Sequence, residues 1–204
     1  MSKAKENLKA QQAQATIEKL LAVARQEFSA KGYAAASTEE IVQQAGVTRG
    51  ALYHHFPGKQ GLFVAVFEAA QGEINRRIVA AADAAGSPWE QLLAGCRAFL
   101  EACIDPQLQQ IVVIDAPAVL GWALWRQVDA AESVNSLRHS LAELIEAGLL
   151  KPLPLEALTH LLSGAMNEAA VWIAQTDDPA RALAEATSTL EVLLAALRVE
   201  HKPD

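Results

Sequence analysis

The sequence predicts an all-α protein, with an N-terminal three-helix helix-turn-helix unit followed by a larger helical body. Apolar residues recur every three or four positions along most of the chain, which is the period of a helix with one buried face. Glycine, proline and small polar residues separate these stretches where helices start and stop. Asn-Gly and Asp-Gly dipeptides, which are typical of hairpin turns, do not occur in the sequence.

Length and composition limit the class of protein. The chain has 204 residues, of which 51% are hydrophobic and 20% charged, so it can bury a core. Its two cysteines, Cys96 and Cys103, are too few for a disulfide framework and fit a reducing compartment. The amino terminus lacks the apolar run of a signal peptide, and no stretch reaches the roughly 18 uninterrupted apolar residues of a membrane span. We therefore expect a soluble, cytoplasmic protein that does not enter membranes.

The first two helices are defined by their end signals. The first is predicted to end at Gly32, which suits a left-handed cap. Its buried face consists of Ile17, Leu20, Leu21, Ala24 and Phe28. Ser37 and Glu40 form a capping box, in which Ser37 accepts from the first turn and Glu40 reaches back. The second helix that they open is short, because Gly46 ends it.

The third and fourth helices follow directly. Thr48 caps the third helix, Leu52 is its inward residue, and Pro57-Gly58 breaks it within about two turns. A long helix then runs from Lys59 to about Asp83, with a continuous apolar side.

The rest of the chain is divided by similar punctuation. Gly86-Ser87-Pro88 combines a cap glycine, an N-cap serine and a proline in the first turn, and Glu90 completes a second capping box. Asp105-Pro106, Asp115 and Asp178-Pro179 open further helices, and Gly148 ends one. The expected helices are about 88–103, 106–114, two between 115 and 147, 155–174 and 179–198, which makes nine or ten in all.

Residues 38–56 have the spacing of a helix-turn-helix, whose second helix enters the major groove of DNA. An ordinary helical corner has the same spacing, so the outward residues decide between the two. With Leu52 inward, a turn of about 100° per residue defines the outward face. The residues on this face are Gly50, Ala51, Tyr53 and His54. Small residues in the middle of the helix would let its backbone approach a groove closely.

The charge is unevenly distributed and favours the same end of the chain. The net charge is −7, yet residues 1–60 carry eight Lys or Arg against five Asp or Glu. A basic head on an acidic body indicates that only the head meets a polyanion, although so small an excess also arises by chance. Lys59 lies in the first turn of a helix, where a cation opposes the helix dipole. That placement would be favourable if a phosphate were bound there.

The segment Gly46-Val47-Thr48-Arg49-Gly50-Ala51-Leu52-Tyr53-His54-His55-Phe56-Pro57-Gly58-Lys59 resembles the signature of the TetR family of transcriptional repressors. Phe28, Gly32-Tyr33 and Ile41 also fall where that family keeps its small three-helix core, so the resemblance covers about residues 16–67. It implies a DNA-binding domain at 1–58, with a polar tail at 1–13, and an effector-binding and dimerisation domain at 59–204. It also implies a homodimer formed through the last two helices, about 154–175 and 179–198.

The resemblance assigns roles to individual residues. Thr38 would meet a phosphate, Tyr53 and His55 the DNA backbone, and Lys59 would join them. Those facing base edges would be Thr48, Arg49, Gly50 and Ala51. We expect Arg49 to matter most, because a guanidinium can pair with O6 and N7 of guanine.

Two features leave alternatives open. Glu39 stands where the tetracycline-responsive repressor has a base-reading arginine, so it either accepts from a cytosine amino group or faces solvent. Lys3, Lys5 and Lys9 either form an arm in the minor groove or belong to a frayed, solvated tail, which we favour.

The effector pocket is predicted from apolar and isolated polar residues of the body. Ligand sites are mostly apolar with a few convergent polar groups. The apolar candidates are Phe99, Cys103, Trp122, Trp125 and Met166, and the polar ones are Arg126, Asn135, His139 and Asn167. The alternative is that these residues pack the core or tie helices together. No His and Cys pair has ligand spacing on one helix face, so we expect no metal, and we expect no cofactor.

The last two helices are more apolar than singly packed helices require, which favours a four-helix bundle across a two-fold axis. The predicted function is a ligand-responsive transcriptional repressor that binds a palindromic operator on double-stranded DNA and is released by an unknown small molecule. The alternatives are a constitutive DNA-binding regulator without a ligand and an enzyme or small-molecule carrier on an all-α scaffold. The sequence has no Gly-rich phosphate loop, Gly-x-Ser-x-Gly or His-Glu-x-x-His motif, which argues against an enzyme.

Overall fold

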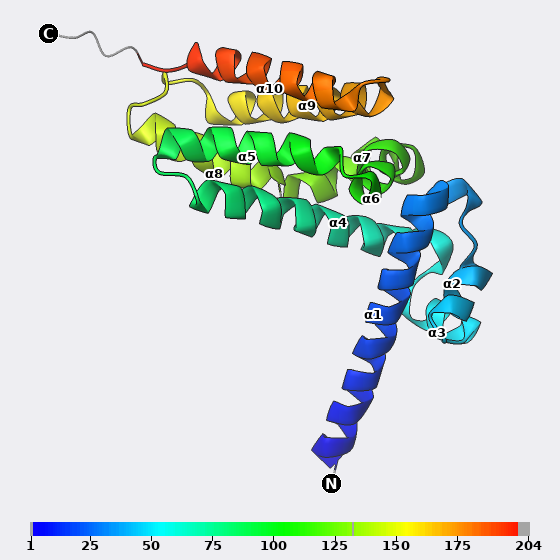
Figure 1. Cartoon of the computed structure of the whole chain (residues 1–204). Coiled ribbons are helices and arrows are strands. Elements are labelled where there is room, and N and C mark those ends of the chain that lie inside the picture. The colour runs from blue at the N-terminus through cyan, green and yellow to red at the C-terminus, as the bar shows by residue number, and fades with distance from the viewer. Residues whose placement is uncertain (1, 132, 200–204) are drawn as a thin grey trace, which may run out of the picture.

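Figure 1 shows a small group of helices at one end of the long helix α4 and a larger bundle along its length. The structure is a computed structural model that describes residues 2–131 and 133–199, apart from the side chains of residues 2–6 and 130. Its elements are α1 (Ser2–Ala35), α2 (Thr38–Gln44), α3 (Arg49–His55), α4 (Gly58–Asp83), α5 (Pro88–Cys103), α6 (Pro106–Leu108), the π-helix η1 (Gln109–Asp115), α7 (Ala116–Ala131), α8 (Ser133–Glu146), α9 (Leu155–Gln175) and α10 (Pro179–Ala195). Within the described residues the only extended pairing is an isolated bridge between Leu150 and Arg198. The all-α prediction is confirmed.

The N-terminal unit is built on one aromatic cluster. Phe28 of α1 and Phe63 of α4 meet edge to face with ring centroids 5.1 Å apart, and Tyr33 lies 5.0 Å from Phe63. Ile41 of α2 and Leu52 of α3 are fully buried in the same core. The amphipathic pattern of the first three helices thus produces a packed unit in which α4 takes part.

Two predictions for this unit are corrected. The expected frayed tail is helical and continuous with α1, so Lys9 lies on a helix; the side chains of Lys3 and Lys5 lie outside the described part. Gly32 interrupts the helix with a φ of 74°, as its sequence context predicts, and one more turn follows. Ser37 accepts from the Glu40 amide as expected, but the Glu40 carboxylate accepts from Lys31 at 2.6 Å instead of reaching back.

The segment after α5 differs most from prediction. The expected helix 106–114 is one turn of α-helix followed by a seven-residue π-helix, a form often found at functional positions. Asp115 was predicted to cap the next helix, but it lies inside η1 and its side chain bonds elsewhere. Gly121, with a φ of 74°, interrupts α7, a break that was not predicted.

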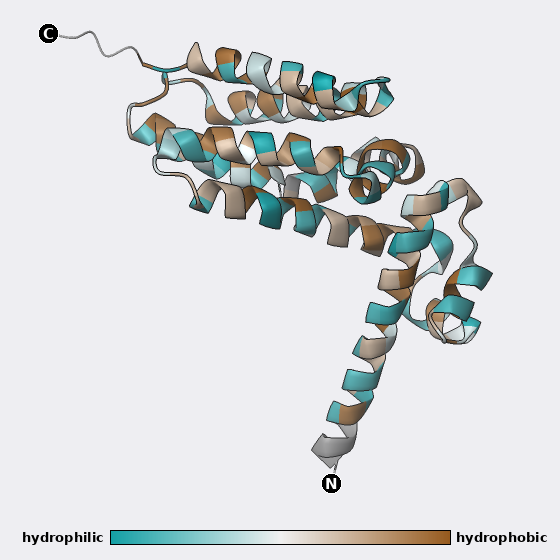
Figure 2. Cartoon of the chain, viewed as in Figure 1, coloured by the Kyte–Doolittle hydropathy of each residue, from teal (hydrophilic) through white to brown (hydrophobic). Residues whose placement is uncertain are grey.

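The larger bundle contains α5, α8, α9 and α10 beside the length of α4, and Figure 2 shows hydrophobic and hydrophilic residues alternating around these helices. By length and composition alone, the stretch Pro106–Glu146 is apolar enough to cross a membrane. In the fold it is divided into α6, η1, α7 and α8, and the last three bury Ile111, Trp125 and Leu141 in the core. Packing accounts for only part of its apolar character, because Ile114 and Trp122 of the same stretch are exposed.

Candidate DNA interface and effector cavity

The short helix α3 is held in place at both ends. Thr48 caps it by accepting from the Ala51 amide at 3.1 Å. Leu52 and Phe56 are buried on its inner side, and the Phe56 amide closes the last turn on the Leu52 carbonyl at 2.8 Å. A helix of seven residues has little stability of its own, so these anchors determine which side faces out.

The outer side of α3 carries most of the residues that the sequence placed there. Gly50, Tyr53 and His54 are exposed and Ala51 is half-buried. Of the other predicted DNA contacts, Thr48 and Arg49 are exposed, and Thr38, His55 and Lys59 are half-buried. All nine lie on α2, on α3 and its N-cap residue, and at the start of α4, so the structure brings this group together on the small unit.

Arg49 is positioned by contacts within the protein. Its guanidinium lies over the Tyr53 ring, 5.5 Å from the centroid, and 3.4 Å from Oε1 of Glu39. Backbone hydrogen bonding, followed by bonds from Thr38 and Ser37, lowers the pKa of Glu39, so this carboxylate is ionised at neutral pH. Glu39 is exposed, which fits both alternatives, and its neighbour is the arginine of the next helix.

Contacts within the protein account for the position of Lys59 in the first turn of α4. Its ammonium donates to the Ala34 carbonyl at 3.2 Å and lies over the Tyr33 ring, 4.6 Å from the centroid. These contacts offset the unfavourable position of a cation in the first turn of α4. The placement of Lys59 therefore does not by itself require a phosphate.

The small unit is joined to the bundle at the last turn of α1. The Tyr33 amide donates to Oδ2 of Asp115 in η1 at 2.7 Å. The turn approaches η1 so closely that a Cβ at Gly32 would meet Nε2 of Gln110 at 3.2 Å. A second link joins Gln60 of α4 to the Val119 carbonyl of α7 at 3.2 Å. This small N-terminal unit, formed by α1, α2, α3 and the start of α4, is called the DNA-facing unit below. It is thus bonded directly to the π-helix.

A cavity of about 340 Å³ lies beside the same π-helix, between α4, α5, η1, α7 and α9. Its walls are mainly apolar, and Trp122 and Trp125 lie at one side with ring centroids 5.2 Å apart. Six of the nine predicted pocket residues line it: Phe99, Cys103, Trp122, Trp125, Arg126 and Asn167. Trp122 is 71% exposed and therefore stands at the mouth. The volume is within the range of sites for small organic ligands.

A buried ion pair forms the polar part of this cavity. Asp129 is only 2% exposed and accepts from Arg126 at 2.8 Å and from Asn167 at 3.2 Å. Burial raises the pKa of Asp129, while bonds from Asn167, Arg126 and Gln71 oppose that rise. Arg126 also contacts Ser163 at 3.1 Å and His160 at 3.3 Å.

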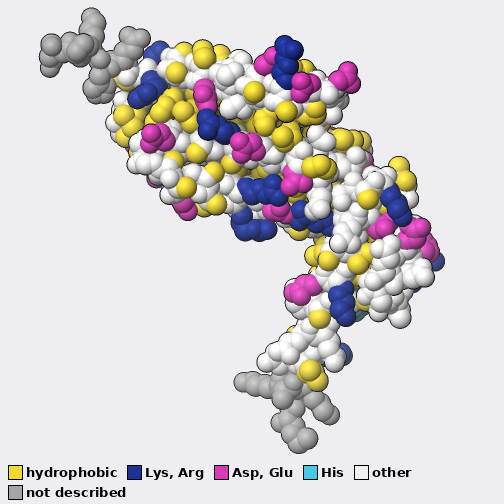
Figure 3. All heavy atoms as spheres, in the orientation of Figure 1, with side chains coloured by type: hydrophobic (Ala, Val, Ile, Leu, Met, Phe, Trp, Pro, Cys, Tyr) yellow, Lys and Arg dark blue, Asp and Glu magenta, His cyan; other side chains and the backbone are white. Residues whose placement is uncertain are grey.

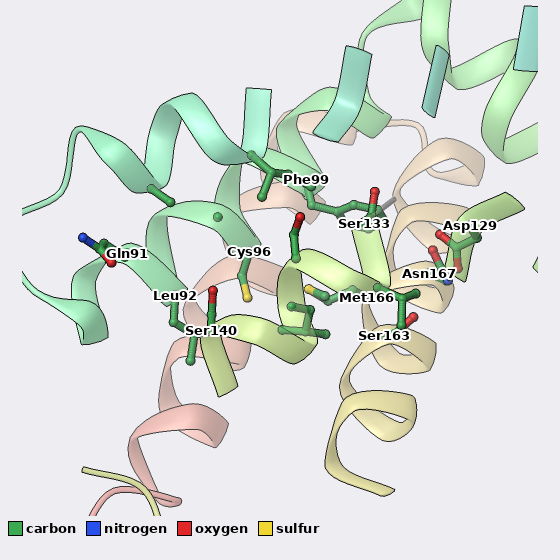
Figure 4. A pocket seen from close by; sticks show the side chains of 16 residues that line it. Gln91, Leu92, Cys96, Phe99, Asp129, Ser133, Ser140, Ser163, Met166 and Asn167 are labelled. Carbon is green, nitrogen blue, oxygen red and sulfur yellow. Dashed lines mark hydrogen bonds between the residues drawn. The ribbon is translucent and has the colours of Figure 1, made fainter. Parts of the chain in front are cut away.

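A smaller crevice of about 40 Å³ is lined in part by the same residues, because it shares Phe99, Asp129 and Asn167 with the cavity. Figure 4 shows Asp129, Asn167 and Ser163 grouped at one end of this crevice and Gln91, Leu92 and Ser140 at the other. Met166, another predicted pocket residue, lines the crevice rather than the cavity.

Two predicted pocket residues, Asn135 and His139, are misplaced. The buried face of α8 runs through Val134, Leu137 and Leu141, so both residues lie on its solvent side. His139 is 3.3 Å from Glu143 on the same exposed face. The sequence marked them as isolated polar residues but did not show which side of the helix was inward.

Sequence reasoning also missed members of the polar cluster. Gln71 occupies a position on the buried face of α4, between Phe67 and Ile74, and Asp129 stands one turn after Trp125. A polar residue at a buried helical position is the signal that could have found both. Burial raises the pKa of Cys103 to about 12, so this thiol is a neutral part of the wall. Among the described residues, no group of three His, Cys, Asp or Glu is placed to hold a metal ion.

The outer face of α9 and α10 exposes large apolar side chains. Leu161 is 73% and Val192 69% exposed, and Trp172 and Leu193 are also exposed. Figure 3 shows hydrophobic side chains along the α9 and α10 part of the molecule, with charged side chains of both signs at one end of α10 and elsewhere on this face. Apolar residues this exposed on adjacent helices are typical of an interaction surface.

Comparison with known proteins agrees with this architecture. Residues 20–66 match the family model described as bacterial regulatory proteins, tetR family, and residues 89–197 match the tetracyclin repressor-like C-terminal domain. The chain is 31% identical to the transcriptional regulator AcrR of Shigella flexneri over 74% of this chain and 72% of that protein. It is 29% identical to the TetC protein of transposon Tn10 from Escherichia coli, over 73% and 75% of the two chains.

Among solved structures, a TetR-family transcriptional regulator from Pectobacterium atrosepticum is 39% identical, covers 94% of this chain and 98% of its own, and superimposes with a TM-score of 0.82. Its likeness extends over both the DNA-facing unit and the helical bundle. Members of this family are DNA-binding regulators and not enzymes. The chain belongs to the tetR family of bacterial transcriptional regulators.

Proposed function

We propose that this protein is a repressor that binds a palindromic operator as a homodimer in the cytoplasm and is released by a small-molecule effector. In this proposal residues 1–58 bind DNA, and residues 59–204 hold the effector and dimerise through α9 and α10. The last five of these residues lie outside the described part of the chain.

The observation that carries the proposal is that one element, η1, contacts both the cavity and the DNA-facing unit. Val112 and Val113 of η1 line the cavity, and Asp115 at its end accepts from the Tyr33 amide. A ligand that displaces η1 would therefore shift the last turn of α1, where Tyr33 packs against Phe63 of α4. A hundredfold loss of operator affinity needs only about 2.7 kcal/mol of differential binding between the two arrangements.

On the DNA side, Arg49 is the proposed base-reading residue, because its exposed guanidinium can pair with one guanine. Gly50 supports this arrangement, since a Cβ there would meet only Oγ1 of Thr48, at an ordinary 3.8 Å. The protein itself has room for a side chain at Gly50, so the lack of a side chain there favours close approach by DNA. Thr48 and Ala51 would lie at base edges, and Thr38, Tyr53, His54, His55 and Lys59 would contact the backbone.

Two other functions are less well supported. A constitutive regulator without a ligand would have a filled core, whereas a cavity of about 340 Å³ lies beside η1. A carrier on an all-α scaffold would not need an exposed arginine beside a glycine on α3. Selection from a random duplex library tests the DNA function: enrichment of a two-fold symmetric site supports it, and the absence of any enriched site contradicts it.

Replacing Arg49 with alanine is expected to cost about 1 to 3 kcal/mol of operator binding and to relax specificity at one position of each half-site. The loss arises because no other side chain of α3 can donate two hydrogen bonds to a guanine. Fluorescence anisotropy with the selected operator, and with single-position variants of it, measures both effects.

Lys59→Ala is the matched comparison for that experiment. It removes a cation near the backbone, so all sequences should bind more weakly and the slope of log affinity against log salt should fall by about one. If Arg49→Ala lowered the affinity for all DNA sequences equally, as is expected of Lys59→Ala, the base-reading role of Arg49 would be wrong.

Replacing Asp115 with alanine should loosen the link between η1 and the DNA-facing unit. The Tyr33 amide would lose its acceptor, at a cost of about 1 to 3 kcal/mol, and its hydrogen exchange should accelerate. Asp115→Asn keeps a carbonyl oxygen at this position, so the Tyr33 amide should exchange more slowly in this variant than in the alanine variant. Exchange of the Tyr33 amide at the unchanged rate in both variants would contradict the role of this bond.

A further inference from the structure

We infer that Glu39 determines how strictly this protein discriminates between DNA sequences: its carboxylate holds Arg49 in one direction and lowers the affinity for DNA of any sequence. The inference deepens the proposed function and rests on it, because it requires that Arg49 reads a base. Three observations support it: the donors that converge on Glu39, the exposure of its ion pair with Arg49, and the negative charge that it places among the DNA-facing residues.

Three donors converge on the Glu39 carboxylate. The hydroxyl groups of Ser37 and Thr38 each donate to Oε2 at 3.2 Å, and Nη1 of Arg49 lies 3.4 Å from Oε1. Backbone hydrogen bonding and the two hydroxyl groups lower the pKa of Glu39, so the carboxylate is charged at neutral pH. One carboxylate oxygen is thus fixed at the start of α2, and the other is presented to α3.

The ion pair between Glu39 and Arg49 is open to solvent on the side where DNA would bind. The two side chains are 65% and 66% exposed. Exposed ion pairs contribute little to the free energy of unfolding, because water and salt screen their charges. The pair does restrict Arg49, whose guanidinium also lies over the Tyr53 ring, 5.5 Å from the centroid. Its effect is therefore expected on DNA recognition and not on stability.

A restrained Arg49 is a more selective reader than a mobile one. An unrestrained guanidinium can bond to any phosphate oxygen, or to the single acceptors that adenine and thymine present in the major groove. Guanine presents two acceptors, O6 and N7, and suits a guanidinium held in one direction. Since a guanidinium has five N–H donors, the contact of Nη1 with Glu39 leaves donors for the base.

The same carboxylate opposes binding to phosphate groups. DNA is a polyanion, so an ionised carboxylate at the interface lowers the affinity for every sequence. Glu39 also engages the hydroxyl hydrogen of Thr38 and one side of the Arg49 guanidinium, for which a phosphate would have to compete. Pairing of Arg49 with its guanine offsets this cost on the operator, whereas random DNA provides no such compensation. Glu39 therefore increases the difference in affinity between operator and random DNA.

The test is Glu39→Gln in the full-length protein, which removes the charge and keeps the size of the side chain. Fluorescence anisotropy would use three duplexes: the selected operator, the operator changed at the position that Arg49→Ala relaxes, and a random duplex of equal length. We expect the affinity for the random duplex to rise about three- to tenfold, with a steeper salt dependence. We expect the preference for the operator base at the changed position to fall at least about threefold.

Two comparisons separate the positioning of Arg49 from a general effect of charge. Glu40→Gln removes a charge from the next position of α2, where the carboxylate pairs with Lys31 at 2.6 Å, and should leave the base preference unchanged. In the Arg49→Ala background, Glu39→Gln should also leave the base preference unchanged, because the guanidinium that it holds is gone. Circular dichroism and thermal melting establish that each variant is folded.

The inference is overturned if Glu39→Gln leaves the base preference or the random-duplex affinity unchanged, or if Glu40→Gln lowers the base preference as much. It is also overturned if Glu39→Gln relaxes a different position of the operator, since Glu39 would then read a base itself. The proposed function fails in a different way, when no operator is enriched or when Arg49→Ala relaxes no position.

Discussion

Replacing Leu161 and Val192 together with glutamate is expected to produce a monomer of 21.8 kDa whose operator affinity is lower by at least about a hundredfold. Both side chains are more than two-thirds exposed in the single chain, on α9 and α10, so the substitutions do not disturb its own core. In the proposed dimer, charges of like sign would be brought together at the two-fold axis in an apolar interface.

The loss is large because the two recognition helices act as a linked pair. When one binds its half-site, the other is held near the second half-site at a high effective concentration, and a monomer lacks this advantage. Sedimentation velocity measures the mass of the protein, and fluorescence anisotropy measures its affinity for operators with one and two half-sites. The monomer should no longer distinguish the two operators.

Val79→Glu is the control for this double variant. Val79 is also an exposed apolar residue, but it lies on α4, so the same substitution there should leave both mass and affinity unchanged. A double variant that remained dimeric, or a dimer that was lost equally on Val79→Glu, would show that α9 and α10 do not form the interface.

Phe63→Ala is expected to lower the free energy of unfolding by about 3 to 5 kcal/mol. Phe63 is fully buried and is in ring contact with Phe28 and with Tyr33 in the last turn of α1. Its removal would leave a cavity where three segments of the DNA-facing unit meet, and these segments cannot close over it without moving the turn bonded to Asp115. Urea denaturation followed by circular dichroism gives the free energy.

Glu68→Ala, on the exposed side of the same helix, separates this effect from a general loss of helix stability. It should change the free energy of unfolding by no more than about 0.5 kcal/mol. A loss below about 1 kcal/mol for Phe63→Ala would mean that the aromatic cluster is not the core of the unit.

Much of the fold could be predicted because its signals are local. Thr48 and Ser87 cap the helices that their sequence contexts indicate, and Leu52 is buried where the helical period places it. The failures have one physical cause. The π-helix at 109–115 and the break at Gly121 depend on how residues 109–121 pack between α1, α4 and α9. The spacing of apolar residues along the sequence carries no information about that packing.

The candidate site shows the same division. The DNA-facing residues lie within 22 positions of one another, from Thr38 to Lys59, so sequence spacing could group them. The cavity is assembled from five elements, and its polar residues were only partly identified: Arg126 and Asn167 were expected, Gln71 and Asp129 were not. Asn135 and His139 were expected, but the rotation of α8 turns them to solvent.

The sequence by itself determined the all-α class, the helix-turn-helix and its outward face, and the resemblance to one family, because caps, breakers and helical period act over a few neighbouring residues. Only the tertiary structure decided which distant groups meet. Asp115 reaches the Tyr33 amide across 82 positions, and Asn167 reaches Asp129 across 38. These bonds depend on the crossing and rotation of packed helices, and therefore the link between the cavity and the DNA-facing unit follows from the packing and not from any local pattern.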